Sequence, residues 1–447
     1  MAAAIDEPAR ETDVLVVGGG PAGVGAAFAA ARQGAKVLIV EQFNCLGGVA
    51  TAGGHAQMTI FNAWGDSTRV VGGIPYEIAQ RIEREGFGQL RGGAVFFEIE
   101  PLKFLYERMA RELGVETLYH TFFCEALVEN GAVAGVAVQN KSGRRILRAK
   151  RVVDCTGDGD VGASAGAPVE IGRPGDGRCQ PVTLMFTIGG VNWDCVSRWR
   201  KDYKMKEVWA RAQRNGDMEP FQDQVMGFWW TPTRPDQVGV NFTHVIGVDA
   251  TRAEDLTWAT IEARRQAFHS LDVFRKYVPG MERAYMVSIP HTLGLRESRR
   301  LMGEVVLTEQ DMLARREWPD TIGYGSFFID IHNLDGPGMA ESTVRPEPGF
   351  RYQIPYRILV PRGVENLLCA GRCVSVTHVA LGSIRVMVQC MLSGQAAGAA
   401  AALSLREGVS PRNLPVQPLQ AALRAGQALL SEEDIARANS RSAFSVA

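Results

Sequence analysis

The sequence predicts an α/β protein in which a parallel sheet flanked by helices carries an inserted region of α+β type. Three observations support this fold class. Residues 12–41 alternate apolar strand, Gly-rich turn, Ala-rich helix and apolar strand, the pattern of a parallel β-α-β unit. Residues 115–154 contain successive short strands separated by turns, and residues 386–405 form one long apolar segment. At 447 residues the chain is too long for one simple core, so we expect two domains in close contact.

The first unit contains a strand over residues 14–17, a helix over residues 22–32 and a second strand over residues 36–40. A Gly-x-Gly-x-x-Gly motif separates the first strand from the helix, and the second strand ends on an acidic residue. The motif alone is weak, but the strand, the helix and the acid together complete the context of a Rossmann-like dinucleotide-binding unit. The alternative is a Gly-rich turn in an ordinary α/β unit.

Each glycine of the motif has its own physical reason in this interpretation. Gly18 permits the tight turn, Gly20 lets a pyrophosphate approach the backbone because it lacks a Cβ, and Gly23 lets the helix pack against the strand. The helix begins at Pro21 and Ala22, where free N–H groups and the positive end of the helix dipole favour phosphate.

The acid at the end of the second strand is Glu41, which we expect to accept hydrogen bonds from both hydroxyls of an adenosine ribose, with Gln42 beside it. The stretch that follows is too rich in glycine for a stable helix or strand. It contains Gly47, Gly48 and Thr51, and we predict a loop whose backbone comes close to a bound cofactor.

Two helices and a β-meander complete the first part of the chain. The helices are expected to start near Pro75 and Pro101, because proline suits the first turn of a helix. Strand signals follow over residues 115–119, 121–128 and 132–139, the last two joined by an Asn-Gly turn. An apolar strand over residues 151–154 then enters a Gly/Asp loop that contains three candidate cofactor ligands, Thr156, Gly157 and Asp158.

The composition changes between residues 166 and 350, where tryptophans concentrate. Strands are expected over residues 182–188, 225–231, 238–245, 285–291 and 321–331, with a helix over residues 253–277. We therefore expect an inserted α+β substrate-binding domain over residues 166–350. The remaining residues, 1–165 and 351–447, would then form one discontinuous domain that binds the dinucleotide.

The last part of the chain again shows a strand, a Gly-containing turn and an apolar helix, as the first part does. A short strand over residues 366–370 leads into a turn, and a long buried helix is expected over residues 386–405. We expect this helix to begin near residue 383 and to direct its N-terminal dipole at the cofactor. A surface helix over residues 414–430 and a loosely held tail would follow. The candidate cofactor ligands here are Gly371, Arg372, Gly382, Ser383, Ile384 and Arg385.

The element order resembles the layout of the glutathione-reductase-like class of FAD proteins. In that class the early fingerprint binds the ADP half, and a C-terminal Gly-containing turn with a helix N-terminus holds the flavin half. We find no second Gly-x-Gly-x-x-Gly in a strand context, so a tightly bound NAD(P)H site of the reductase type is not expected.

The sequence is also similar to the bacterial FAD-dependent oxidoreductase family that carries a Gly-Gly-x-Ala-Thr loop after the ribose acid. The stretches that carry the resemblance are residues 46–53, 71–73, 154–160, 293–300, 307–311, 330–333, 354–357 and 394–398. The resemblance implies FAD as cofactor and redox chemistry, with diverse substrates. Many relatives in the wider class place Asp after the C-terminal Gly, whereas this chain has Arg372, for which we expect a phosphate or the flavin carbonyl edge as partner.

Four residues are candidates for catalysis in such an enzyme. His332 and His378 rank first as a base or as hydrogen-bonding groups for the substrate, and His55 follows the flavin loop. A histidine base with an ordinary pKa predicts that flavin reduction slows below about pH 6.5. Arg296 is expected to clamp a substrate carboxylate or to stabilise reduced flavin. The alternatives are structural histidines and an inter-domain ion pair.

A further buried arginine is expected near the cofactor. Arg385 stands at the start of the apolar C-terminal helix, and a buried guanidinium needs an anion beside it. We therefore expect Arg385 to contact the flavin or its phosphates.

The composition limits the classes of partner that we expect for this protein. The formal net charge of −1 gives no sign of a nucleic-acid or membrane partner, and the eight scattered cysteines show no zinc-type spacing, so we expect no metal. Scattered thiols and the absence of a signal-type apolar core before residue 12 fit a cytoplasmic protein. A small-molecule substrate is expected, and the sequence does not decide between a monomer and a homo-oligomer.

Three functions remain possible from the sequence. The first is an FAD-dependent oxidase or dehydrogenase that removes hydride from a C–H next to O or N, or a pair of hydrogens from C–C, in a small organic substrate. The second is an FAD-dependent monooxygenase, and the third is a non-catalytic FAD-holding protein. NAD(P)H consumption separates the first two, and turnover with a redox dye separates both from the third.

Overall fold

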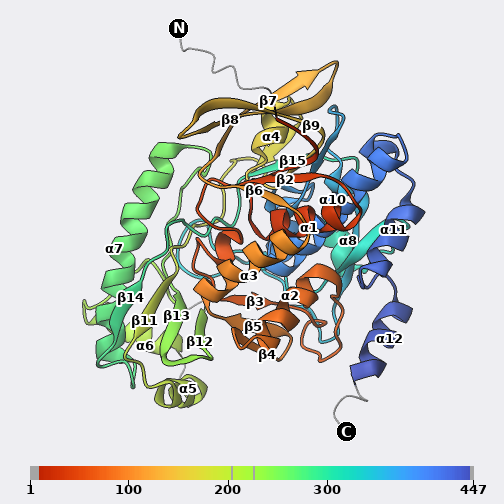
Figure 1. The fold of residues 1–447 in the computed structure, drawn as a ribbon. Coiled ribbons are helices and arrows are strands. Elements are labelled where there is room, and N and C mark those ends of the chain that lie inside the picture. The colour runs from red at the N-terminus through yellow and green to blue at the C-terminus, as the bar shows by residue number, and fades with distance from the viewer. Residues whose placement is uncertain (1–9, 203–204, 225–226, 443–447) are drawn as a thin grey trace.

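The computed structural model describes residues 10–202, 205–224 and 227–442 (Figure 1). Its main sheet has seven strands among the described residues, in the order β6-β2-β1-β9-β8-β7, with β18 also paired to β9. The strands are β1 (Arg10–Val17), β2 (Val37–Val40), β6 (Glu116–Leu118), β7 (Phe122–Glu129), β8 (Ala132–Asn140), β9 (Gly143–Asp154) and β18 (Leu367–Cys369).

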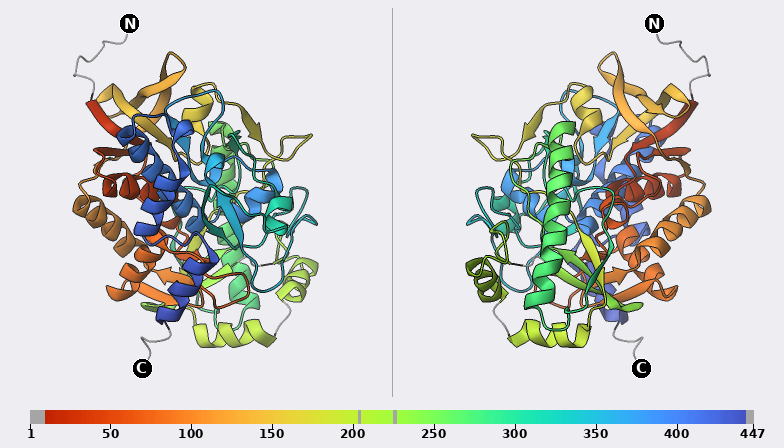
Figure 2. Two further views of the ribbon diagram at one scale, coloured as in Figure 1. Left: turned by 90° about the vertical axis from the view of Figure 1, so that its right-hand side faces the viewer. Right: turned by 90° about the vertical axis from the view of Figure 1, so that its left-hand side faces the viewer.

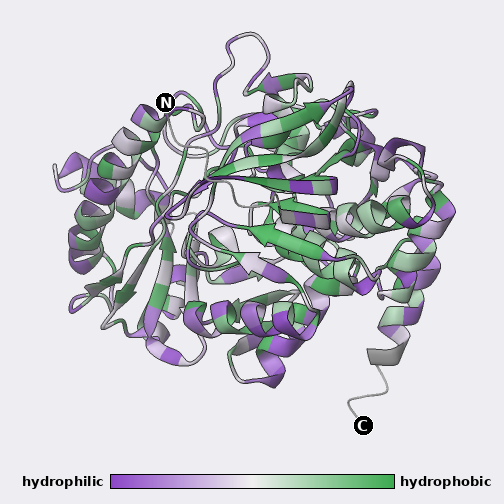
Figure 3. Cartoon of the chain, turned by 45° about the horizontal axis from the view of Figure 1, so that its top comes forward, coloured by the Kyte–Doolittle hydropathy of each residue, from purple (hydrophilic) through white to green (hydrophobic). Residues whose placement is uncertain are grey.

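This sheet confirms the predicted Rossmann-like fold with a meander. β1 pairs in parallel with β2 and β9, β2 pairs in parallel with β6, and β18 pairs in parallel with β9. β8 is antiparallel to both β7 and β9, as the predicted hairpins require. Residues 14–17 of β1 and all of β2 are apolar (Figure 3) and buried, whereas β6 is partly exposed.

Helices α1 (Pro21–Arg32) and α10 (Met387–Arg406) pack directly against each other, and both contact β1 and β9 of this sheet. Their backbones approach so closely that small residues are required. A Cβ at Gly394 would lie 2.0 Å from the Ala22 carbonyl oxygen, and one at Gly398 would lie 1.9 Å from the Ala26 carbonyl oxygen. α10 is buried on every side except at its C-terminal end, as its uniformly apolar sequence predicts.

The segment before α10 differs from the expectation. Residues 378–384 form their own helix, α9 (His378–Ile384), which meets α10 at 93°. The long helix therefore begins at Met387, and the prediction of a start near Ser383 is wrong. The chain bends at Arg385 and Val386 because both helices must pack into the core in different directions.

The inserted region contains a four-stranded antiparallel sheet in the order β12-β13-β11-β14 and the long helix α7 (Ala253–Tyr277). Figure 2 shows α7 on the side of the molecule opposite the C-terminal helices. Val225 and Met226 of the predicted strand 225–231 lie outside the described residues. The strands and the flanking helices are β11 (Phe186–Gly189), β12 (Gly227–Thr231), β13 (Arg234–Asn241), β14 (Tyr285–Ser288), α5 (Trp193–Asp202) and α6 (Met205–Arg214).

Three expected strands of this region are shorter than predicted, and a fourth is displaced. The expected strand 285–291 ends at Ser288, and the expected strand 238–245 corresponds to β13, which runs from Arg234 to Asn241. The expected strand 182–188 begins only at Phe186, and the expected strand 321–331 ends at Gly325. Beyond these ends the backbone makes isolated bridges, such as Val182 with Val245 and His332 with Met339. Apolar residues continue through these segments because they pack against neighbours without a continuous ladder.

A small sheet that the sequence analysis missed lies beside the inserted region. β4 and β5 form a hairpin around Gly92 and Gly93, both with positive φ, and β5 pairs with β3. Figure 1 shows this sheet next to β12. The remaining elements are β3 (Gln57–Thr59), β4 (Gly88–Arg91), β5 (Ala94–Phe97), β10 (Val169–Ile171), β15 (Arg299–Leu301), β16 (Thr321–Gly325), β17 (Tyr352–Pro355), α2 (Gly73–Arg84), α3 (Ile99–Glu112), α4 (Asp160–Ser164), α8 (Glu309–Leu313), α11 (Val416–Ala425) and α12 (Glu432–Ser442).

Among the described residues, no single helix has both the length and the apolarity needed to cross a membrane. The bent pair α9–α10 passes on length and composition alone. Both helices are buried in the core, which accounts for their apolar sequence.

The close approach of α1 and α10 gives a prediction for stability. Gly398→Ala should destabilise the protein by about 1–3 kcal/mol, because the new methyl group meets backbone that cannot move freely. Gly426→Ala is the control, since its Cβ would have no neighbour nearer than 3.4 Å and its φ is −80°. Thermal unfolding measures both, and equal melting temperatures would contradict the prediction.

Candidate functional site

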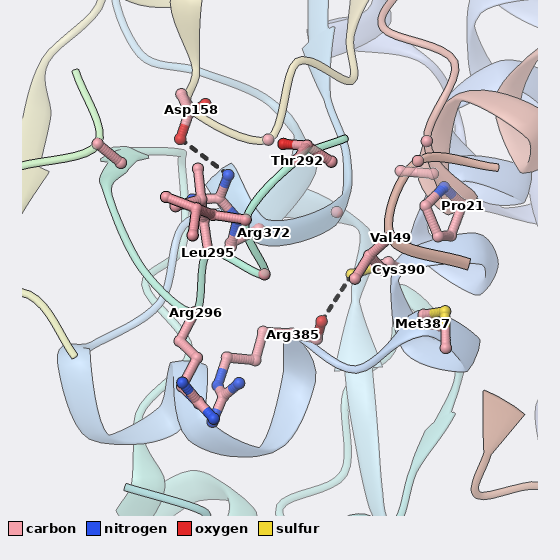
Figure 4. A pocket seen from close by; sticks show the side chains of 18 of the residues that line it. Pro21, Val49, Asp158, Thr292, Leu295, Arg296, Arg372, Arg385, Met387 and Cys390 are labelled. Atoms are coloured by element: carbon pink, nitrogen blue, oxygen red, sulfur yellow. Dashed lines mark hydrogen bonds and ion pairs between the residues drawn. The ribbon is translucent and has the colours of Figure 1, made fainter. Parts of the chain in front are cut away.

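A cavity of about 1320 Å³ extends from the β1–α1 turn into the inserted region. Its wall is formed by the carboxyl ends of parallel strands, the N-terminus of α10 and loops of the inserted region. Such an edge of a parallel sheet is where α/β proteins bind ligands. Figure 4 shows Pro21, Val49, Met387 and Cys390 on one side of the view, and Asp158, Thr292 and Leu295 on the other.

The β1–α1 turn has the geometry that a dinucleotide requires. Gly18 has φ +98°, and a Cβ there would lie 2.4 Å from the Cys155 carbonyl oxygen. A Cβ at Gly23 would lie 1.9 Å from the Gly18 carbonyl oxygen, so the helix packs directly on the turn. Gly20 has nothing within 4 Å of its Cβ position and lines the cavity beside Pro21 and Ala22.

The N-terminus of α1 is open toward this space. No side chain caps it, and Gly20 is the N-cap. The first N–H groups of a helix have no partner within the helix, so an anion in the cavity can accept from them. The turn therefore fits a pyrophosphate without any change of the backbone.

Glu41 lies at the cavity wall but also holds the loop around it. Its Oε2 accepts from the Gly19 N–H at 2.6 Å, and its Oε1 accepts from the Phe43 N–H at 2.9 Å. Burial raises the pKa of this carboxyl group. A carboxylate has about four acceptor positions, so both oxygens can still accept from ribose hydroxyls. Gln42 lines the cavity next to it.

The Gly-rich loop divides into a residue that lines the cavity and residues that support it. Gly48 lines the cavity, and a Cβ there would lie 2.8 Å from the Gly20 Cα. Gly47 and Thr51 lie behind it. A Cβ at Gly47 would lie 2.8 Å from the Tyr106 ring, and Thr51 Oγ1 donates to the Leu46 carbonyl at 2.7 Å.

The Gly/Asp loop and the C-terminal turn meet at the cavity. Thr156, Gly157, Asp158, Gly371 and Arg372 all line it. Arg372 donates to Asp158 Oδ1 at 2.8 Å and to the Ser298 hydroxyl at 2.7 Å. Its partner in the structure is thus a carboxylate of the protein, where we had expected a phosphate or the flavin edge.

The α9–α10 junction places its residues differently from the expectation. Gly382, Ser383 and Ile384 are buried in α9 and do not line the cavity. Ser383 instead donates to the Phe327 carbonyl at 2.5 Å, and a Cβ at Gly382 would lie 2.8 Å from the Asp330 carbonyl oxygen. Arg385 does line the cavity, as do Val386, Met387 and Cys390 at the true start of α10.

Arg296, Arg385, Asp330 and His332 form a buried group that we call the arginine cluster. Arg385 donates to Asp330 Oδ2 at 3.1 Å, so its anion is a protein carboxylate and not the flavin or phosphate that we had expected. Arg296 donates to the Pro181 carbonyl at 2.6 Å and to the Thr183 hydroxyl at 3.3 Å. Burial, and then the charge of Arg385, lower the pKa of Arg296 to about 9, so it stays charged at neutral pH.

His332 is the neutral member of the arginine cluster. Burial and the nearby Arg296 charge lower its pKa to about 4. Its Nε2 lies 3.6 Å from Asp330 Oδ2, while its Nδ1 is buried without a hydrogen-bond partner among the described residues. The ring therefore has one nitrogen directed at a carboxylate and one nitrogen free to accept a proton.

Two more histidines near the cluster are neutral for the same reasons. His55 lines the cavity and contacts Trp229 edge-on at 4.6 Å between ring centroids. Burial and the charge of Arg296 lower its pKa to about 4. His244 lies 6.1 Å from His332 between ring centroids, and its pKa is lowered to about 3 by burial and then by the charge of Arg296.

His378 lies apart from this group. It is buried in the first turn of α9, where its Nδ1 lies 2.8 Å from Glu297 Oε1, and it does not line the cavity. Glu297 also accepts from Arg300 at 2.6 Å. The structure thus brings His332, Arg296 and His55 to the cavity and places His378 in a buried ion network behind it.

Several cavity residues were not predicted. Asp330 stands in the stretch 330–333 that carried the family resemblance, and its carboxylate was the signal that could have found it. An aromatic wall of Trp64, Phe327 and Phe328 also lines the cavity, with Phe327 and Phe328 centroids 4.6 Å apart. No sequence signal joins Trp64 to the other two. No group of three or more metal-binding side chains occurs in the part of the chain that the structure describes.

Residues 13–423 match a family model described as FAD dependent oxidoreductase. Among curated proteins, the thiamine thiazole synthase of Aeropyrum pernix is 36% identical over 159 residues, which are 33% of this chain and 54% of that protein. Digeranylgeranylglycerophospholipid reductase 1 of Methanopyrus kandleri is 36% identical over 171 residues, which are 35% of this chain and 42% of that protein. The chain thus spans about half the length, or less, of these curated relatives.

The similarity to solved structures is low. A geranylgeranyl bacteriochlorophyll reductase-like protein of Thermoplasma acidophilum gives a TM-score of 0.46 at 14% identity, covering 94% of this chain and 83% of that one. A flavin-dependent brominase gives a TM-score of 0.47 at 12% identity, covering 93% and 83%.

The open space at Gly20 gives a prediction that separates cofactor binding from folding. Asparagine is a favourable N-cap, so Gly20→Asn should leave the melting temperature of the apoprotein unchanged or raise it. The side chain would fill the space over the turn and compete for the helix N–H groups, weakening FAD binding by about 1–3 kcal/mol. FAD titration and thermal unfolding measure the two effects, and wild-type affinity would show that the pyrophosphate binds elsewhere.

Proposed function

Because this chain belongs to the FAD dependent oxidoreductase family, we propose that it removes a hydride from a C–H next to O or N in a small organic substrate. The observation that carries the proposal is His332, a neutral buried histidine with a free ring nitrogen in the same cavity as the dinucleotide turn. Oxidation of such a C–H releases a proton from the heteroatom, and a neutral histidine can accept it.

The residues of the wall suit FAD. The β1–α1 turn and Glu41 would hold the ADP half, and Gly48, Gly371 and the N-terminus of α10 would hold the flavin half. When bound, FAD supplies the two-electron acceptor that the reaction needs. We assign residues 1–165 and 351–447 to the domain that holds FAD, and residues 166–350 to the domain that supplies most of the substrate site.

The protein's own contribution is to bind the substrate and to move one proton. Asp330 lies beside Nε2 of the His332 ring, and the ring would take the proton from the substrate hydroxyl or amine. The C–H electron pair leaves as hydride, and the product is a carbonyl compound or an imine.

The direct test is to purify the protein with its cofactor and to mix it anaerobically with a panel of alcohols and amines. Bleaching of the flavin absorbance by one of them would support the proposal. Faster NAD(P)H consumption in air with a substrate than without it would instead indicate a monooxygenase. Bleaching only by substrates that yield a C=C bond would indicate C–C dehydrogenation.

The lowered pKa of His332 changes the expected pH profile. A histidine with a pKa of about 4 is already neutral above pH 5, so flavin reduction should be constant between about pH 5 and pH 8. The base form is lost only as pH falls through the lowered pKa. Rapid-mixing kinetics measure the profile, and a midpoint near 6.5 would show that another group acts as the base.

Replacement of the ring tests the same residue. His332→Ala should slow flavin reduction by about 10²–10⁴-fold while FAD stays bound. His120→Asn is the control, because His120 is exposed and does not line the cavity. Asparagine tolerates the positive φ of +53° at this position. A wild-type reduction rate in His332→Ala would assign the proton to another acceptor.

A further inference from the structure

The arginine cluster carries an unbalanced positive charge. Arg296 is buried and Arg385 is largely buried, and Asp330 is the carboxylate that pairs with Arg385. Burial works against ionisation of Asp330, but the charges around it hold its pKa below the ordinary value, so it is an anion. His332 and His55 are neutral at physiological pH. One positive charge in the cluster is therefore without a counter-ion.

Arg296 is the group that lacks the anion. Both of its hydrogen bonds go to neutral oxygens, those of Pro181 and Thr183. Within the described residues no carboxylate lies within ion-pair distance of it. These two hydrogen bonds fix the plane of the guanidinium, and Arg296 lines the cavity. A buried guanidinium that is held rigidly without an anion is costly unless a ligand supplies one.

The guanidinium group of Arg385 lies next to that of Arg296. Figure 4 shows the Arg296 and Arg385 side chains converging, with their guanidinium groups next to each other. Arg385 uses one nitrogen on Asp330, and its Nε is buried without a partner among the described residues. Two adjacent guanidinium groups on one cavity wall form a site for a carboxylate, which accepts from two donors at once.

The wall beside this site is apolar. Trp64, Phe327 and Phe328 are half-buried and line the cavity, with the Trp64 and Phe328 ring centroids 4.9 Å apart. Arg345, which is exposed, lies over Phe328 at 5.1 Å and adds charge of the same sign at the cavity. A small inorganic anion would leave this aromatic wall in contact with water, whereas an organic acid with an apolar body would cover it.

We propose that the substrate is an organic carboxylate with an apolar body, whose carboxylate binds between Arg296 and Arg385 and whose body packs on Trp64, Phe327 and Phe328. This inference rests on the proposed function, because it names the substrate class of that reaction. His332 is part of the same cluster, so the carboxylate would hold the oxidised carbon within reach of the base. The hydroxyl or amine that loses its proton would then lie close to the carboxylate, as in a hydroxy or amino acid.

The test uses ligand binding without turnover. The oxidised holoenzyme is titrated with sodium benzoate, benzamide and sodium acetate, and the flavin difference spectrum reports binding. Benzoate should bind about tenfold or more tightly than benzamide, which lacks the charge, and than acetate, which lacks the apolar body. Equal affinity for benzoate and benzamide would overturn the proposal.

Variants locate the charge. Arg296→Gln should weaken benzoate binding by about tenfold to a hundredfold and change benzamide binding by less than about threefold. Arg264→Gln, on the exposed surface of α7, is the matched control and should bind benzoate as the wild type does. If Arg296→Gln does not retain FAD, Arg296→Lys and the wild-type comparison of the three probes decide. Benzoate affinity unchanged in Arg296→Gln would refute the assignment.

The reduction potential separates a substrate site from a flavin site. The potential of the ligand-free enzyme should be the same in Arg296→Gln and in the wild type. A lower potential together with unchanged benzoate affinity would show that Arg296 serves the reduced flavin. If benzoate binds through Arg296 but no hydroxy or amino acid bleaches the flavin, the proposed reaction fails while the carboxylate site stands.

Discussion

The contact between α1 and α10 is the constraint on which the rest of the structure depends. It joins the first helix of the chain to its last long helix at a separation that only glycine permits, at Gly394 and Gly398 on one side and Gly25 on the other. This contact brings the N-terminus of α10 beside the dinucleotide turn. The cofactor cavity therefore exists only when the two ends of the sequence are folded together.

Burial shifts the pKa values of His55, Arg296 and His332 more than any single charged neighbour does. Asp158 and Arg372 neutralise each other, and Glu297 neutralises Arg300 behind the wall. Among the described residues Arg296 has no carboxylate partner of this kind, and its charge helps to keep the nearby histidines neutral. The lowered pKa keeps the His332 ring unprotonated at neutral pH, and it also makes the ring a weaker base than an ordinary histidine.

The elements that depend on local sequence were predicted well. The Gly-x-Gly-x-x-Gly turn, the strands around it, the meander and the buried helix depend on short-range periodicity and on glycine geometry, so a window of a few residues contains the information. The start of α10 near Ser383 was placed wrongly, since the residues on both sides of the bend are buried and only the packing of two helices fixes the bend between them.

The sequence by itself determined the dinucleotide turn and the α/β class, because both are encoded by neighbours along the chain, and it indicated FAD through a resemblance that spans most of the chain. The tertiary structure alone decided the partners of the charged groups. Arg372 meets Asp158 and Arg385 meets Asp330 across long sequence separations, and His378 turns to Glu297 while His332 stays at the cavity. Which anion a buried arginine finds, and whether a histidine is charged, depend on distance and burial in space, and no local pattern records either one.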